Sequence, residues 1–273
     1  MTVDRAEVVS IVEAHYSSRE MRAVLERIAD DAQALLTFMG RFFQYAAAFS
    51  VGQAALASQV AARKDLFKVS GEVGVFADAS MSVGRGIFFG AIDEFGDREI
   101  GGQHTHRALA LATLKGMAAH FDYDLSRLSD RVLSHAPTTE AIAKVSRYYG
   151  VNVAIDEARL FRGIGFHLGT EVLGEDENRV FDAFFSSRLP ALMASLGRAT
   201  VRLNNVAVPA DVWFKRHIVA EADHFAAGID SANLAFEHYS GRSSRTQLRH
   251  WVAEGIQAVA SVQRDVMRTI LVD

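Results

Sequence analysis

The sequence contains no cysteine, which excludes disulfide bonds, thiolate-bound metals and a cysteine nucleophile. Proline is also scarce: Pro137, Pro190 and Pro209 are the only three in 273 residues. A proline inside a helix removes a backbone hydrogen bond and clashes with the preceding turn. The scarcity of proline therefore leaves long stretches in which helices can run.

An excess of charge of one sign and long apolar runs are missing as well. The 29 basic and 33 acidic residues give a net charge of −4 without any basic block, so nucleic acid is not an expected partner. The sequence contains no run of about 18 uncharged apolar residues, the length that a membrane-spanning helix needs, so no membrane span is expected. The first twenty residues are charged and amphipathic, unlike a signal peptide. We therefore expect a cytoplasmic protein without a membrane partner.

Apolar residues are abundant, at 49%, and they recur mostly at spacings of three and four. This periodicity predicts an all-α protein. We expect one helical domain over residues 1–273, with a core from about 35 to 240 on which the N-terminal helices and the C-terminal helix pack. The expected helices start near Val8 and Met21 and cover about 35–62, 106–119, 138–173, 180–196, 209–239 and 244–271. Residues 174–178 should break or bend the chain, 71–96 should form a broken helix or two short ones, and 197–208 should be a connection.

The strongest chemical signal is His217, Glu221 and His224 on the helix after Pro209. Positions i, i+4 and i+7 lie within about 60° of one another on a helix, so two imidazoles and a carboxylate share one face. Burying three ionisable groups is costly unless a divalent metal compensates, and these donors suit iron, manganese or zinc. The alternative is a solvated polar face whose histidines are accidental.

The second signal is Glu94, which follows the apolar segment 86–92 and is expected to face inward. Its alternative is a solvated acidic pair at a helix end. His104 and His106 follow ten and twelve residues later, and residues two apart on a helix point about 200° apart, so only one should be a ligand. Spacing favours His104, whereas the apolar phase that includes Leu109 favours His106. We predict His106, with His104 in the loop and partly solvated.

The third signal is Glu171, in an apolar neighbourhood beside Gly165 and Gly169. Glycines four residues apart allow close helix packing. His167, one turn earlier, could donate a hydrogen bond to a metal ligand. An ordinary core histidine is the favoured alternative for it.

Together these segments resemble the haem-oxygenase-like di-iron oxidases and oxygenases. The family pattern is an acidic helix end Asp-Glu-x-Gly, a histidine opening the next helix, a mid-chain glutamate, and His-x3-Asp/Glu-x2-His on a late helix. The resemblance covers roughly residues 38–240 and implies a haem-oxygenase-like helical bundle. The metal ligands that it implies are Glu94, His106 with His104 as the alternative, Glu171, His217, Glu221 and His224. The family more often has aspartate where this chain has Glu221. A further carboxylate, used by some N-oxygenating members, would be Glu72 or Asp78, and neither is a convincing match.

The resemblance implies two Fe2+ ions, with a manganese–iron pair left open, and O2 as co-substrate. The expected function is oxidation of a small organic substrate, with an external reductant, as in N-oxygenation of an amine or amino acid in specialised biosynthesis. An alternative is cleavage of C–C or C–H bonds of an amino or fatty acid. An alternative of another class is a metal-free binding protein or thiaminase-like hydrolase on the same scaffold, although the thiaminase type uses a cysteine that is absent here. The apolar last helix is compatible with a homodimer.

Overall fold

The computed structural model describes residues 2–69, 78–96, 104–203 and 205–272, and the side chains of 216–222 lie outside the description. Helices make up 77% of the chain, so the expectation of a mostly helical protein is confirmed. No helix in the described residues is long and apolar enough to cross a membrane. The helices described are α1 (Arg5–Glu13), α2 (Ser18–Ile28), α3 (Ala32–Ala62), α4 (Ala79–Phe95), α5 (His106–His120), α6 (Ser126–Leu133), α7 (Ala136–Tyr148), α8 (Glu157–Arg188), α9 (Pro190–Arg198), α10 (Val212–His238) and α11 (Arg245–Thr269).

Several helices begin at a side chain that caps their first turn. The side chains of Asp31, Thr105, Asp156 and Ser244 each accept a hydrogen bond from the backbone N–H three residues further on. Such a cap satisfies a donor that the helix itself leaves unpaired. These residues therefore fix where α3, α5, α8 and α11 start.

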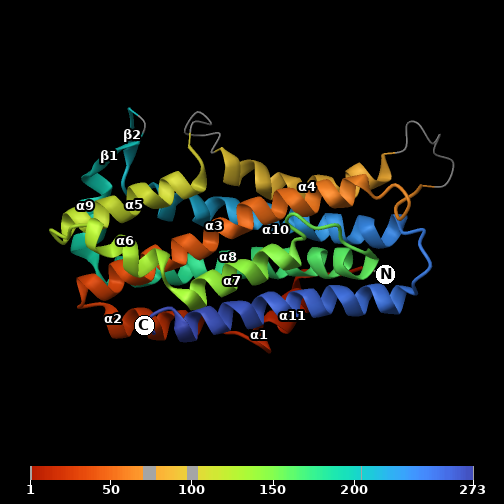
Figure 1. Ribbon diagram of the computed structural model, residues 1–273, viewed down its shortest axis with the longest axis horizontal. Helices are drawn as coiled ribbons and strands as arrows, with labels where there is room; N and C mark the ends of the chain where they lie inside the picture. The colour runs from red at the N-terminus through yellow and green to blue at the C-terminus, as the bar shows by residue number, and fades with distance from the viewer. Residues whose placement is uncertain (1, 70–77, 97–103, 204, 273) are drawn as a thin grey trace.

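The long helices run along the long axis of the molecule (Figure 1). Helix α4 packs against both α3 and α10, and α8 packs against α10, α11 and α3. Helix α5 adjoins α3, α4 and α10, whereas α1, α2 and α11 lie on the opposite side of the bundle. A cluster of buried apolar side chains draws on every helix from α1 to α11. The centre of the bundle is therefore bounded by α3, α4, α8 and α10.

Glycines allow the central helices to approach closely. A Cβ atom at Gly86 of α4 would lie 2.1 Å from the Ala227 carbonyl oxygen of α10. A Cβ atom at Gly165 of α8 would lie 1.9 Å from the Val252 carbonyl oxygen of α11. Both distances are far below contact distance, so only glycine fits this backbone spacing. The close packing predicted for Gly165 is therefore present. In the segment expected to be broken, the described residues form one helix, α4, and residues 70–77 lie outside the described residues.

The predicted helix break at 174–178 is wrong, and so is the predicted continuity from 138 to 173. The chain turns between α7 and α8, where Gly150 has a φ of 70° that favours glycine. Residues 174–178 lie inside α8. Glu175 pairs there with Arg5 and Arg179, which offsets the charge of the acidic run.

The segment expected as a connection contains a hairpin of β1 (Thr200–Leu203) and β2 (Val206–Pro209). The strands pair antiparallel, with Leu203 opposite Val206, and Asn205 takes a φ of 68°. Asparagine tolerates this left-handed conformation, and β-branched residues on both sides favour strands. The hairpin projects beside α5 and α9 (Figure 1).

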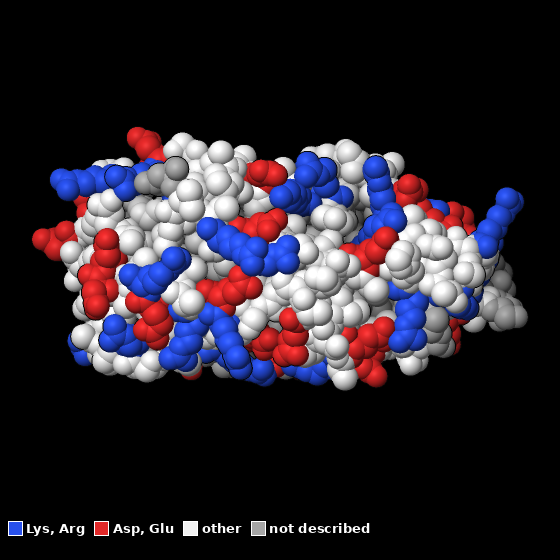
Figure 2. Space-filling view, turned by 90° about the horizontal axis from the view of Figure 1, so that it is seen from below, with Lys and Arg blue, Asp and Glu red and all other residues white. Residues whose placement is uncertain are grey.

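Charges of both signs are interspersed on the surface. In the face seen from below, Lys and Arg side chains alternate with Asp and Glu, without a large area of one sign (Figure 2). Ion pairs at the surface include Arg22 with Glu26 and Arg268 with Glu20. Such exposed pairs contribute little to stability, typically about 0–1 kcal/mol each.

Candidate metal centre and adjoining cavity

Glu94 and His106 join the end of α4 to the start of α5. His106 is the first residue of α5, and its Nδ1 lies 3.1 Å from Glu94 Oε1. Ser50 of α3 donates a hydrogen bond of 2.6 Å to the other carboxylate oxygen. His106 is 6% exposed, so this imidazole lies inside the bundle. Glu94 therefore turns inward, toward α3 and α5.

His104 is also buried, at 4% exposed, so the expectation that it is partly solvated is wrong. Its Nε2 has no hydrogen-bond partner among the described residues. The loop at 97–103, which precedes His104, lies outside the described residues. His106 contacts Glu94, as the apolar phase of the helix that begins at His106 indicated. Which of the two histidines binds a metal stays a prediction.

His224 of α10 reaches across to α4 and α8. Its Nε2 lies 2.9 Å from Asp93 Oδ2, and its Nδ1 lies 3.8 Å from Glu171 Oε2. The ring of Phe89 packs against the imidazole with centroids 5.6 Å apart. Asp93 was not among the predicted ligands. Its place in the acidic pair with Glu94 was the only signal in the sequence that could have identified it.

Glu171 of α8 is 2% exposed and lies at the middle of the bundle. Gln53 of α3 donates a hydrogen bond of 2.9 Å to its Oε1. Burial, together with the negative charge of Glu94, raises the pKa of Glu171 to about 8. An ionised carboxylate at this depth is stabilised only when a cation lies close to it.

His167 lies one turn before Glu171 and is 1% exposed. Its Nδ1 is 3.2 Å from Glu171 Oε1, but neither ring nitrogen forms a hydrogen bond with the described residues. Burial and the neighbouring His224 lower the pKa of His167 to about 3, so the imidazole is neutral. The hydrogen bond to a ligand, which was the less favoured interpretation of His167, is absent from the described contacts.

These residues fit a divalent cation in kind, because buried imidazoles and carboxylates are the donors that iron, manganese and zinc take. Within the described part of the chain, however, no three His, Asp or Glu side chains form a group that could hold a metal ion. His217 and Glu221 belong to α10, but their side chains lie outside the described residues. A complete ligand set therefore depends on these two residues.

Of the further carboxylates named from the sequence, Asp78 does not join this group. Asp78 caps the opposite end of α4, sixteen residues before Glu94 and hence about 24 Å away along the helix. Its carboxylate accepts a hydrogen bond from Ser82. Glu72 lies outside the described residues.

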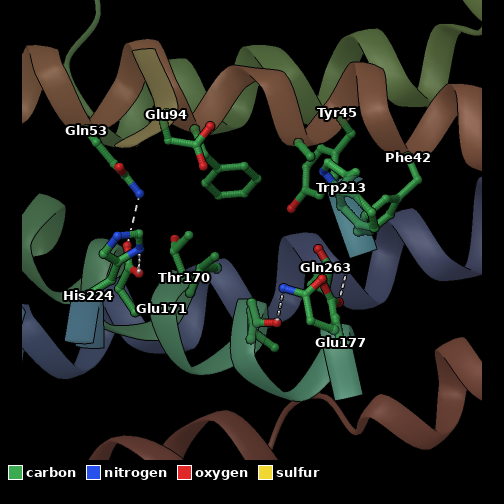
Figure 3. Close-up of a pocket in the computed structure, with 16 residues that line it drawn as sticks. Phe42, Tyr45, Gln53, Glu94, Thr170, Glu171, Glu177, Trp213, His224 and Gln263 are labelled. Carbon is green, nitrogen blue, oxygen red and sulfur yellow. Dashed lines mark hydrogen bonds and ion pairs between the residues drawn. The ribbon is translucent and has the colours of Figure 1, made fainter. Parts of the chain in front are cut away.

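A cavity adjoins the cluster and extends along α8 (Figure 3). The cavity has a volume of about 90 Å³. Gln53, Glu171 and His224 lie at one end, and Tyr45, Trp213, Glu177 and Gln263 lie at the other (Figure 3). Three aromatic residues of α3 line the cavity, namely Phe42, Tyr45 and Phe49.

The fold and the cluster define a mostly helical protein in which α4, α5, α8 and α10 bring acidic and imidazole side chains together beside a cavity. No family model and no curated protein matches the sequence, and no solved structure matches the fold.

Proposed function

We propose that this protein is a non-haem di-iron enzyme with a haem-oxygenase-like bundle, which activates O2 to oxidise a small organic substrate. One observation carries the proposal: Glu94, His106, Glu171 and His224, which come from four different helices, are gathered in the bundle beside a cavity. Bundles that bind two metal ions place such carboxylates and histidines on facing helices. The sequence resemblance supports the same assignment.

The six ligands of this proposal are Glu94, His106, Glu171, His217, Glu221 and His224. Glu171 lies between the other proposed ligands, because it is close to His224 and because the charge of Glu94 opposes its ionisation. Glu171 would therefore help His224 to hold the bound metal. The bound iron pair supplies the two-electron reduction of O2 that protein side chains cannot perform.

The other side chains hold the ligands in place. Ser50 and Gln53 each donate a hydrogen bond to one ligand carboxylate, Glu94 and Glu171 respectively. Asp93 accepts from His224 and thereby fixes its ring orientation, as outer hydrogen bonds do for metal-bound histidines. Insertion of one oxygen atom of O2 into a substrate, with the other released as water, consumes two electrons and two protons. The proposal therefore includes an external reductant.

The experiment is to add O2 to protein that has been reconstituted anaerobically with ferrous iron. We expect roughly one O2 consumed for every two iron ions, because each ferrous ion supplies one electron, with an absorbance change in the near ultraviolet. His224→Ala should abolish both signals. His250→Ala is the matched control, since His250 is 63% exposed on α11 and should change neither signal. Wild-type protein that binds iron but consumes no O2 would contradict the proposal.

A metal-free binding protein on the same scaffold is the second candidate. It is favoured by the direct pairing of His106 with Glu94 and of His224 with Asp93, which satisfies these groups without a cation. This candidate predicts that ferrous iron neither binds nor changes the thermal stability of the protein. The two candidates therefore differ in the first step of the same experiment.

A further inference from the structure

The far end of the cavity contains a second buried carboxyl group, Glu177, which sequence reasoning did not single out. Glu177 lies on α8, is 6% exposed, and accepts hydrogen bonds at Oε1 from Tyr16 at 3.3 Å and from Gln263 of α11. Among the described residues nothing hydrogen-bonds to its Oε2. Both partners are neutral, so they stabilise a carboxylate only partly.

Tyr45 of α3 lines the same end of the cavity (Figure 3). Its hydroxyl group is buried and has no hydrogen-bond partner among the described residues. A buried hydroxyl without a partner lowers stability, and a ligand with a hydrogen-bond donor or acceptor would recover this loss. Phe42 and Trp213 stand beside it, with ring centroids 6.4 Å apart, and offer aromatic faces to the same space.

The charge of the cavity selects the kind of ligand. The 16 described residues that line it include Glu94, Glu171 and Glu177 but no lysine or arginine. Burial raises the pKa of Glu177 to about 8, because desolvation outweighs the hydrogen bonds from Tyr16 and Gln263. Asp176 adds further negative charge nearby. A cationic group would relieve this cost, whereas a carboxylate on a ligand would meet like charge and no basic side chain.

We propose that Glu177 and Tyr45 bind the ammonium head of an aliphatic amine, whose chain extends along the cavity toward Glu94 and Glu171. The proposal rests on the proposed function, for which it names the substrate class. Glu171 and Glu177 are six residues apart on α8, or about 9 Å along its axis. The cavity is lined by both residues, so an aliphatic chain can run along it between the two carboxyl groups. The end of the substrate that is oxidised is then opposite to the anchored nitrogen.

The test is calorimetric titration with three probes of matched shape: n-hexylamine, 1-hexanol and hexanoate. Each is titrated anaerobically into metal-free and into iron-loaded protein. Hexylamine should bind the wild type at least about tenfold more tightly than either other probe, because a charge-assisted hydrogen bond contributes about 1.5–3 kcal/mol. Glu177→Gln, which keeps the shape of the side chain, should remove this preference. Tyr45→Phe should weaken amine binding by about two- to tenfold.

Asp182→Asn is the matched control, because Asp182 is an exposed acid on the same helix and its removal should leave amine binding unchanged. Three results would each overturn the amine site: no binding of hexylamine, equal binding of hexylamine and hexanol, or wild-type affinity for hexylamine in both Glu177→Gln and Tyr45→Phe. Amine binding that depends on Glu177 in a protein that takes up no iron would instead overturn the di-iron proposal and leave the amine site standing. Failure of one proposal is thus distinguishable from failure of the other.

Discussion

At the scale of single residues, the bundle buries several titratable side chains that do not contribute to apolar packing. Glu171, Glu177 and His167 are all buried on one face or another of α8, without an ion pair to a lysine or arginine among the described residues. Each such group lowers stability unless a ligand compensates. This pattern is typical of a functional site, because perturbed ionisable groups gather where a protein binds or reacts.

The carboxyl group of Glu177 makes the stability of the metal-free protein depend on pH. Its pKa is about 8 in the folded protein, against an ordinary value of 4.5. At pH values between 4.5 and about 8, Glu177 holds a proton in the folded state that it has released in the unfolded state. The free energy of unfolding therefore falls as pH rises. The slope is at most about 1.4 kcal/mol per pH unit, and the effect is absent below pH 4.5. Glu177→Gln removes this contribution.

Urea unfolding of metal-free protein at pH 5, 6, 7 and 8 measures the effect. The stability of Glu177→Gln relative to wild type should increase steadily across this range. Tyr16, Gln263, Asp176 and Tyr45 face the carboxyl group and are unchanged in the variant, so they contribute equally to both proteins. Parallel pH profiles for the two proteins would show that Glu177 does not hold a proton in the folded state.

The choice between His104 and His106 is a second prediction at this scale. His106→Ala should lose one ion and the O2-dependent absorbance, because His106 contacts Glu94, whereas His104→Ala should keep most of both. Iron content and absorbance of the two purified variants measure this. If His104→Ala lost both signals and His106→Ala retained both, His104 would be the ligand. The spacing from Glu94 would then have been a better guide than the apolar phase of the helix that begins at His106.

At the scale of elements, the spacing between helices is set by glycines. Gly165→Ala would place a Cβ 1.9 Å from the Val252 carbonyl oxygen, so α8 and α11 would have to separate. We expect a loss of stability of about 1–3 kcal/mol or more. In Gly197→Ala, the nearest atom is Asp211 Oδ2 at 3.5 Å, an ordinary contact, and we expect little change. Thermal unfolding of both variants checks this, and equal melting temperatures would refute the packing argument.

Periodicity predicted the helices whose apolar positions recur regularly and whose ends carry a capping residue. The expected helices at 35–62 and 244–271 correspond closely to α3 and α11. The turn between α7 and α8 was missed, because Gly150 was given less weight than the acidic run at 174–178. The hairpin was missed because its strands are only four residues long.

At the scale of the whole molecule, the parts of the site that lie on one helix or beside a helix end could be predicted, and those that depend on distant packing could not. Glu94, Glu171 and His224 are marked by their apolar surroundings in the sequence. Glu177 looks like one acid among several, and only the packing of Tyr16 and Gln263 around it shows that it is buried. The cavity itself is built from α3, α4, α8, α10 and α11, which local patterns cannot combine.

The central claim is that this bundle binds two iron ions through residues of four helices. Its most direct test is the iron stoichiometry of protein reconstituted anaerobically with ferrous iron, measured for wild type and for His217→Ala and His224→Ala. We predict about two equivalents in wild type, and loss of iron in each variant with helicity retained. A folded wild-type protein that binds no iron would contradict the claim, and so would full iron content in either variant.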